Sequence, residues 1–199
     1  MDYTSAFISM LIILGTFGNI FIFEGILNSL GVKDNEKKKA IRKAYLFAYL
    51  IWIPVYIFGL EFLKFFGISL PAFAIAGSIL LFYIGMEILV KDIPASARLE
   101  NNNKLEEVVI TPMAVPLLTG PGVITTTLIY RSYNLDPFLL FIVFSLAFLV
   151  SFVIVYNGNR ILSKVDKKVI LVLNRISAIM LLAISVELFI HGLKIIVTT

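Results

Sequence analysis

The stretch that decides the fold is Pro-Leu-Leu-Thr-Gly-Pro-Gly-Val-Ile-Thr-Thr (116–126), which lies inside an otherwise apolar segment (109–131). Relative to alanine, glycine lowers helix stability by about 1 kcal/mol and proline by about 3 kcal/mol. The segment is long enough to cross a bilayer, yet it should unwind near its middle. Because hydrocarbon offers no partner to free main-chain groups, the unwound turn must contact protein or line a cavity.

Composition sets the environment of this stretch. Of 199 residues, 59% are hydrophobic and 15% are charged, and the mean hydropathy is +0.97. Soluble domains have about 45–50% apolar and about 25% charged residues. The surplus predicts an all-α integral membrane protein, with residues 1–199 forming a single transmembrane domain. Six membrane-spanning helices are predicted near 4–30, 44–64, 70–90, 109–131, 138–158 and 171–193.

The basic residues predict the orientation in the membrane. Of the 17 lysine and arginine residues, 13 fall in the first, third and fifth loops. The positive-inside rule then places these loops in the cytoplasm and both termini outside the cell membrane. The basic residues are distributed between spans, so the net charge of +4 does not indicate nucleic-acid binding. The chain has no cysteine, which excludes disulfides and thiolate chemistry.

A weak internal repeat relates the two halves of the chain. At an offset of 100 residues, Glu87 aligns with Glu187, and several apolar residues around them also match. A second candidate break, Gly15-Thr16-Phe17-Gly18-Asn19, interrupts the first span as 116–126 interrupts the fourth. Three spans per half predict two inverted three-helix repeats (4–91 and 108–197) joined by a cytoplasmic linker (92–107), with helices 1 and 4 discontinuous. The alternative is a chance match in an apolar sequence.

The two breaks are the predicted substrate site. Half-helices beginning after Gly122 and near Gly18 would present free N–H groups, of Val123, Ile124 and Thr125 in one case and of Asn19 and Ile20 in the other, to an anionic group. Free carbonyls and the Asn19 side chain could receive an ammonium group, which together describes a pocket for a small zwitterion. The predicted substrate-binding residues are Gly15, Thr16, Gly18, Asn19, Thr119, Gly120, Pro121, Gly122, Thr125 and Thr126.

Each of these features has a structural alternative. The glycines and prolines could be kinks or close-packing points, which membrane helices often carry. The threonines could hydrogen bond to carbonyls one turn back, an explanation that fits Thr127 better than Thr125 or Thr126. Glu24, one or two turns beyond the first break, is a candidate for carrying a coupling proton. Its alternative role is to line the cytoplasmic mouth or pair with a loop lysine.

Enzyme chemistry finds little support in the sequence. The one histidine, His191, has no histidine or cysteine partner for a metal site. No aspartate lies within a predicted span, and nothing places a serine beside His191. We therefore expect neither an enzyme nor a protein that needs a metal or other cofactor.

The motifs Gly-Asn-Ile-Phe-Ile-Phe (18–23) and Pro-Leu-Leu-Thr-Gly-Pro-Gly-Val-Ile-Thr-Thr (116–126) resemble those of the MarC family, also called SnatA-type small neutral amino acid transporters. The resemblance covers essentially the whole chain and implies transport of glycine, alanine and similar molecules. Family members commonly have proline where this chain has Phe21. This departure predicts a milder interruption of the first span.

The leading functional hypothesis is a secondary transporter of small neutral amino acids that works by alternating access, coupled to protons or sodium. One rival is a passive channel or a broad-specificity exporter. The other is a membrane-embedded assembly or signalling subunit that carries no flux.

Overall fold

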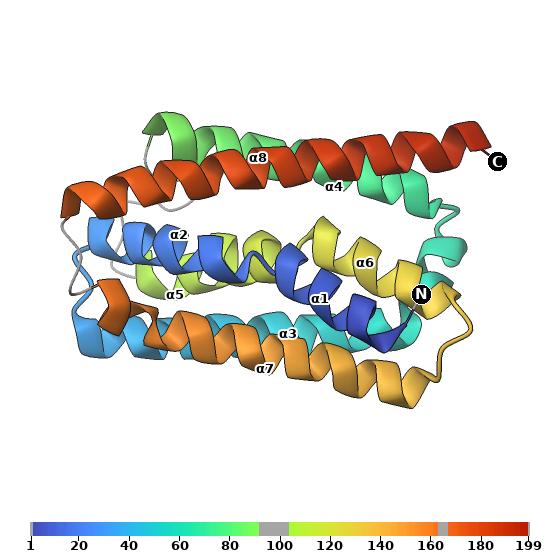
Figure 1. Ribbon diagram of the computed structural model, residues 1–199, viewed down its shortest axis with the longest axis horizontal. Coiled ribbons are helices and arrows are strands. Elements are labelled where there is room, and N and C mark those ends of the chain that lie inside the picture. Colours follow the sequence, from blue (N-terminus) through green and yellow to red (C-terminus); the bar gives the residue numbers. More distant parts are fainter. Residues whose placement is uncertain (1, 92–103, 163–166, 199) are drawn as a thin grey trace.

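The computed structural model describes residues 2–91, 104–162 and 167–198, and all its regular elements in these ranges are helical (Figure 1). The expected all-α fold is confirmed. In chain order the elements are α1 (Tyr3–Ile13), α2 (Thr16–Ser29), α3 (Asp34–Phe65), α4 (Leu70–Lys91), α5 (Lys104–Val108), the irregular helical segment η2 (Val109–Leu118), α6 (Pro121–Ser132), α7 (Pro137–Leu162) and α8 (Lys167–Thr198). Most of the expected linker, residues 92–103, lies outside the described residues.

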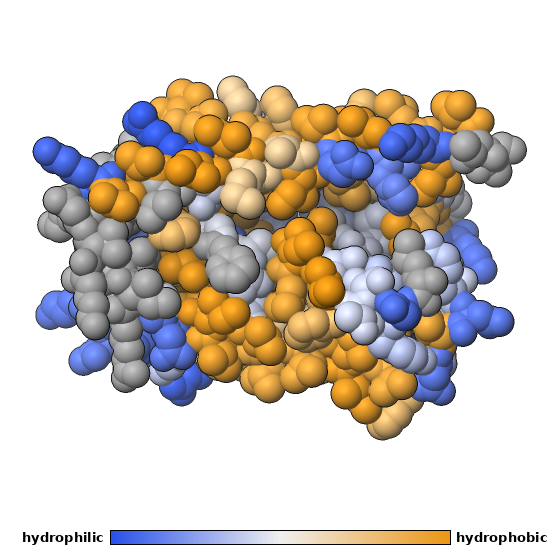
Figure 2. All heavy atoms as spheres, viewed as in Figure 1, coloured by the Kyte–Doolittle hydropathy of each residue, from blue (hydrophilic) through white to orange (hydrophobic). Residues whose placement is uncertain are grey.

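Five helical stretches of the described chain are long and apolar enough to cross a membrane, and the bent pair η2–α6 makes a sixth. Each matches one predicted span. On the face shown in Figure 2, hydrophobic side chains form a belt across the middle, and polar side chains gather toward the two ends. The second span is longer than expected, because α3 begins at Asp34, inside the basic first loop.

The helices form three layers (Figure 1). One outer layer pairs α4 with α8, and the other pairs α3 with α7. Between them lie the two interrupted spans, α1–α2 and η2–α6, each in contact with both outer layers. The interrupted spans are therefore enclosed by continuous helices, as the exposed main chain of a break requires.

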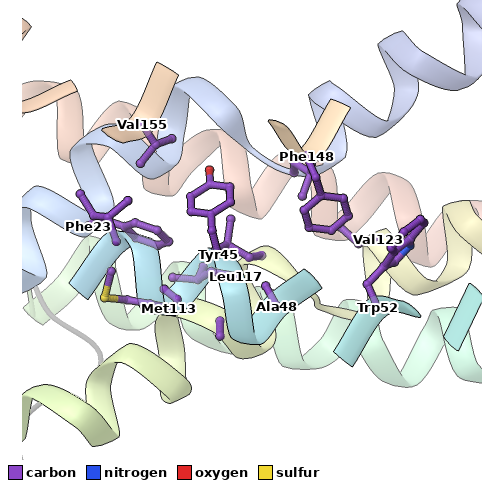
Figure 3. Close-up of a cluster of buried hydrophobic side chains, with 14 of the residues drawn as sticks. Phe23, Tyr45, Ala48, Trp52, Met113, Leu117, Val123, Phe148 and Val155 are labelled. Atoms are coloured by element: carbon purple, nitrogen blue, oxygen red, sulfur yellow. The ribbon is translucent and has the colours of Figure 1, made fainter. Parts of the chain in front are cut away.

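An aromatic cluster fixes α3 against α7 below the breaks. Trp52 is fully buried, packs against Phe141, Phe144 and Phe148 of α7, and donates from Nε1 to the Thr127 hydroxyl at 2.9 Å. Figure 3 shows Trp52 and Phe148 with apolar residues of the broken spans, Leu117 and Val123 among them. The hydrogen bond from Trp52 to Thr127 satisfies the indole N–H, which is the polar end of an otherwise apolar side chain.

Both ends of the chain lie at the same end of the helix bundle (Figure 1). The turn between α3 and α4 and the turn between α6 and α7 lie at that end as well. The basic start of α3 lies at the opposite end. Six crossings of a membrane give this arrangement, since an even number of spans returns the chain to its starting side.

Candidate substrate site at the two helix breaks

The first break lies between Ile13 and Thr16. Gly15 has a φ of 59° there, in the left-handed region that glycine enters without steric cost. The two side chains that follow the break return to the main chain that it exposes. The Thr16 hydroxyl donates to the Leu11 carbonyl oxygen at 2.9 Å, and Asn19 Nδ2 donates to the Leu14 carbonyl oxygen at 2.7 Å. Both carbonyls are thereby satisfied inside the membrane.

A chain of hydroxyl groups connects this break to the outer layer formed by α3 and α7. The Thr16 hydroxyl is hydrogen bonded to Ser151 of α7 at 3.0 Å, and the Ser151 hydroxyl is hydrogen bonded to Tyr45 of α3 at 2.8 Å. All three residues are buried. The position of Thr16 is therefore set by two continuous helices as well as by its own.

The second break is sharper. The two parts of this span, Leu105–Leu118 and Pro121–Ser132, are bent by 42° relative to each other. Within η2 the backbone is also extended at Thr111 and Val115. Each of these residues precedes a proline, and the ring of a following proline disfavours the helical conformation. The peptide bonds before Pro112 and Pro116 are cis.

Close packing and one hydrogen bond hold the second break. The Thr119 hydroxyl donates to the Ala48 carbonyl oxygen of α3 at 2.8 Å. A Cβ atom at Gly120 would lie 1.9 Å from the Pro116 carbonyl oxygen, and one at Gly77 of α4 would lie 1.8 Å from the Pro121 Cβ. Glycine is thus required at both positions for the backbone to approach so closely.

The two breaks meet in the centre of the protein. A Cβ atom at Gly122, in the first turn of α6, would lie 3.0 Å from Cγ1 of Ile13, the last residue of α1. The residues are far apart in the sequence, and the fold brings the end of one half-helix against the start of the other.

A cavity of about 310 Å³ lies beside the first break, between α1–α2 and α8. Four of the ten predicted site residues line it: Gly15, Thr16, Gly18 and Asn19. Ser177 faces them from α8, and its Cβ would lie 3.6 Å from a Cβ at Gly18. The remaining lining side chains are apolar, and none is charged: Ile8, Leu11, Ile12, Ile22, Met180, Leu181 and Ile184. The cavity therefore suits a small molecule without a charged side chain.

Thr125 stands apart among the threonines after the second break. Its Oγ1 is the one buried side-chain oxygen or nitrogen without a hydrogen-bond partner among the residues described. Thr127, by contrast, donates to the Val123 carbonyl oxygen at 2.7 Å, which is the back-bonding that the sequence favoured for it. A buried hydroxyl without a partner costs stability, so Thr125 is a candidate for a role in binding.

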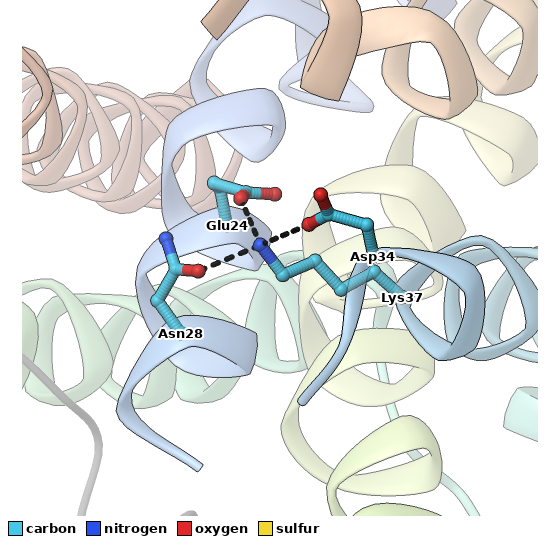
Figure 4. Close-up of polar contacts among 4 residues, drawn as sticks. All are labelled: Glu24, Asn28, Asp34 and Lys37. Atoms are coloured by element: carbon cyan, nitrogen blue, oxygen red, sulfur yellow. Dashed lines mark hydrogen bonds and ion pairs between the residues drawn. The ribbon is translucent and has the colours of Figure 1, made fainter. Parts of the chain in front are cut away.

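Glu24 is part of an ionic cluster at the basic end of the bundle (Figure 4). It forms an ion pair with Lys37, and both are buried, at 6% and 4% exposure. The Lys37 ammonium also donates to Asn28 Oδ1 at 2.6 Å and lies 3.2 Å from Asp34 Oδ1. The cluster joins α2, the second part of the broken span, to the first turn of α3. The structure therefore shows the alternative arrangement, in which a lysine of the predicted first loop pairs with Glu24.

Two expectations about free main-chain N–H groups at the breaks are wrong. The first half-helix begins at Thr16 and not near Gly18, so the Asn19 N–H donates to the Gly15 carbonyl oxygen at 2.7 Å. The Ile124 N–H likewise donates to the Gly120 carbonyl oxygen at 3.0 Å. The carbonyl oxygens of Leu11 and Leu14 each accept one side-chain hydrogen bond. Both helices begin directly after a glycine, Gly15 for α2 and Gly120 for α6, so the first turn of each closes sooner than expected.

Sequence reasoning missed several residues that hold the site. Tyr45, Ser151, Ser177 and Gly77 lie in continuous helices that contact the breaks. Each is unremarkable in its local sequence. Small or hydroxyl-bearing residues in the third and sixth spans could have indicated these contacts. Gly77 and Ser177, for example, align at the offset of 100 residues.

The fold and the site define a polytopic membrane protein in which two broken helices meet at the centre of six spans. Residues 1–197 match the MarC family of integral membrane proteins, and the chain belongs to that family. It is similar to UPF0056 membrane proteins of Pyrococcus abyssi (30% identity over 94% of this chain and 92% of the relative) and Aquifex aeolicus (33% identity over 96% and 92%). Another relative, from Pyrococcus horikoshii, is 31% identical over 93% of this chain and 90% of its own. No solved structure gives a significant match.

Proposed function

We propose that this protein is a secondary transporter of small neutral amino acids, of the glycine and alanine class, that works by alternating access. The observation that carries the proposal is the contact of Ile13 with Gly122, which joins two interrupted spans beside a cavity of about 310 Å³. Interrupted helices near the membrane centre are the usual binding elements of secondary transporters.

The cavity supports the choice of substrate. At about 310 Å³ it is at the lower end of the range for small-molecule sites. Gly15 and Gly18 leave room beside the first turn of α2, whose positive dipole end favours a carboxylate. Asn19 and Ser177 supply polar groups, and the apolar remainder suits a hydrogen atom or methyl group as side chain.

Reciprocal contacts between the halves support an inverted repeat. At each break a threonine forms a hydrogen bond with the second span of the other half. The residue two positions after that threonine packs against the third span of the other half. These contacts pair Thr16 with Ser151, Gly18 with Ser177, Thr119 with Ala48, and Pro121 with Gly77. Two halves that hold each other's broken helix in this way could rock about a shared centre.

For the coupling ion we propose a proton carried at Glu24. This carboxylate is buried on the second half of the broken span, and its partner Lys37 belongs to the neighbouring helix. Protonation of Glu24 would remove its charge attraction to Lys37 and leave the hydrogen bond from Lys37 to Asn28, so proton binding would loosen the contact between α2 and α3. Sodium at the first break has less support, because the Leu11 and Leu14 carbonyl oxygens each already accept a side-chain hydrogen bond.

The test is uptake of labelled glycine by proteoliposomes that contain the purified protein. Proton and sodium gradients are imposed separately. We expect accumulation driven by the proton gradient, and saturable exchange with external glycine or alanine but not with bulky amino acids. Flux without saturation would indicate a channel or a broad exporter instead. Tight glycine binding without flux in either gradient would indicate an assembly or signalling subunit.

A further inference from the structure

A second hollow lies on the outer surface of the α3–α7 layer, away from the substrate cavity. Its volume is about 400 Å³, and it opens sideways between the two helices. Four residues of each helix line it at the spacing of one helix face: Arg42, Tyr45, Leu46 and Tyr49 from α3, and Ser145, Phe148, Leu149 and Phe152 from α7. At 1.5 Å per residue, each set covers about 10 Å along the helix. The hollow is therefore a groove that runs along the membrane normal.

The groove is apolar over most of its length and faces the hydrocarbon. Leu46 and Leu149 are each 55% exposed, so the belt of hydrophobic side chains continues across it. A groove of this kind in a bilayer is filled by an apolar chain, because an empty one would forgo packing contacts on every side.

Two cations stand at the end of the groove nearest the basic loops. Arg42 lines it and donates to the Tyr156 hydroxyl at 3.5 Å, and the Lys38 ammonium lies 5.6 Å from the centre of the Tyr156 ring. Within the described ranges, the carboxylates that form ion pairs are taken by Lys37 and Lys43, and none lies within pairing distance of Lys38 or Arg42. The groove thus combines an apolar lining with positive charge at its end nearest the basic loops.

We propose that this groove is a binding site for an anionic phospholipid. One acyl chain lies between α3 and α7, and the phosphate group contacts Lys38 and Arg42. Basic residues at the membrane surface attract anionic lipids by about 1 kcal/mol each, or about a factor of five. The ring of Tyr45 lines the groove while its hydroxyl is bonded to Ser151, so a bound lipid packs against the hydroxyl chain that ends at Thr16.

The test is lipid binding by the purified, delipidated protein, measured by native mass spectrometry. Phosphatidylglycerol and phosphatidylcholine of identical acyl chains are titrated in parallel. We expect phosphatidylglycerol to bind about 20-fold more tightly, and the double variant Lys38→Gln/Arg42→Gln to abolish this preference. The matched control Lys33→Gln/Lys64→Gln removes the same charge from exposed positions off the groove and should bind as the parent does.

A second variant tests the apolar part independently. Leu149→Trp places a large side chain in the groove at a position exposed to lipid, and it should weaken phosphatidylglycerol binding without changing any charge. Glycerol 3-phosphate, which has the headgroup charge and no acyl chain, should not compete.

Equal binding of the two lipids, full binding by the double variant, or competition by glycerol 3-phosphate would overturn the proposal. So would a dimer cross-linked through Leu149→Cys from which no lipid is released, because a second copy would then cover the groove. Since the readout is lipid binding, the proposal stands or falls independently of amino acid transport.

Discussion

At the scale of single residues, the two threonines Thr125 and Thr127 lie half a turn apart in α6 and differ in whether their hydroxyl groups are hydrogen bonded. Thr127 bonds to the Val123 carbonyl and receives the Trp52 indole N–H. Thr125 is 1% exposed, and its hydroxyl has no partner in the described structure. The Thr125 hydroxyl is therefore available for a hydrogen bond to a ligand, whereas the Thr127 hydroxyl is occupied.

Replacing each threonine by valine separates the two roles. Thr125→Val should leave the midpoint of thermal unfolding in detergent unchanged or slightly higher, because it removes an unsatisfied buried hydroxyl. Glycine uptake should nevertheless fall at least tenfold. Thr127→Val should lower stability by about 1–3 kcal/mol, since it strands the Trp52 indole N–H. Normal uptake by Thr125→Val would remove this residue from the site.

The buried pair of Glu24 and Lys37 gives a second prediction at this scale. Removing one partner of a buried ion pair leaves an uncompensated charge and typically costs about 3–5 kcal/mol. Lys37→Met should therefore lower the unfolding midpoint strongly, and adding Glu24→Gln should restore most of the loss. In proteoliposomes the restored double variant should exchange glycine but fail to accumulate it under a proton gradient. Proton-driven accumulation by that variant would refute coupling at Glu24.

At the scale of helices, the breaks differ in how they are made and in what they touch. The first depends on one left-handed glycine and leaves a cavity next to α8. The second depends on prolines and is packed tightly against α4 through Gly77. The first break is the milder one, as the presence of Phe21 suggested: α1 and α2 together still pass as a single candidate span of 27 residues.

Two glycine-to-alanine substitutions test this difference. At Gly77 a methyl group would lie 1.8 Å from the Pro121 Cβ, so Gly77→Ala should displace α6 and lower both stability and uptake. At Gly18 the nearest atom would be the Ser177 Cβ at 3.6 Å, an ordinary contact distance. Gly18→Ala should fold normally and raise the KM for glycine, because the methyl group enters the cavity. The check is thermal unfolding and uptake kinetics on the same preparations.

At the scale of the whole molecule, three layers enclose the breaks and an even number of spans returns the chain to its starting side. We propose that the basic end is cytoplasmic. The natural chain has no cysteine, so single cysteines report on topology without background. In intact cells, Lys64→Cys should react with a membrane-impermeant maleimide, and Lys39→Cys should react only after permeabilisation. Labelling in the reverse order would invert the assigned orientation.

The sequence by itself determined the membrane class, the six segments and the approximate place of both breaks. These are local properties: hydropathy over about 20 residues, and the conformational limits of glycine and proline, act wherever the chain finally packs. The start of the half-helix after the first break was expected near Gly18 and lies at Thr16. The first turn of a helix depends on which carbonyls its N–H groups can bond, and several starts were compatible with the glycines.

Only the tertiary structure decided which groups meet. Nothing local to Ile13 or Gly122 specifies their contact, and nothing local to Lys37 specifies that it leaves the loop to pair with Glu24. The same holds for Thr127, which meets Trp52 because α3 packs against α6. A partner is fixed by the helices that come together, and that depends on the packing of the whole chain.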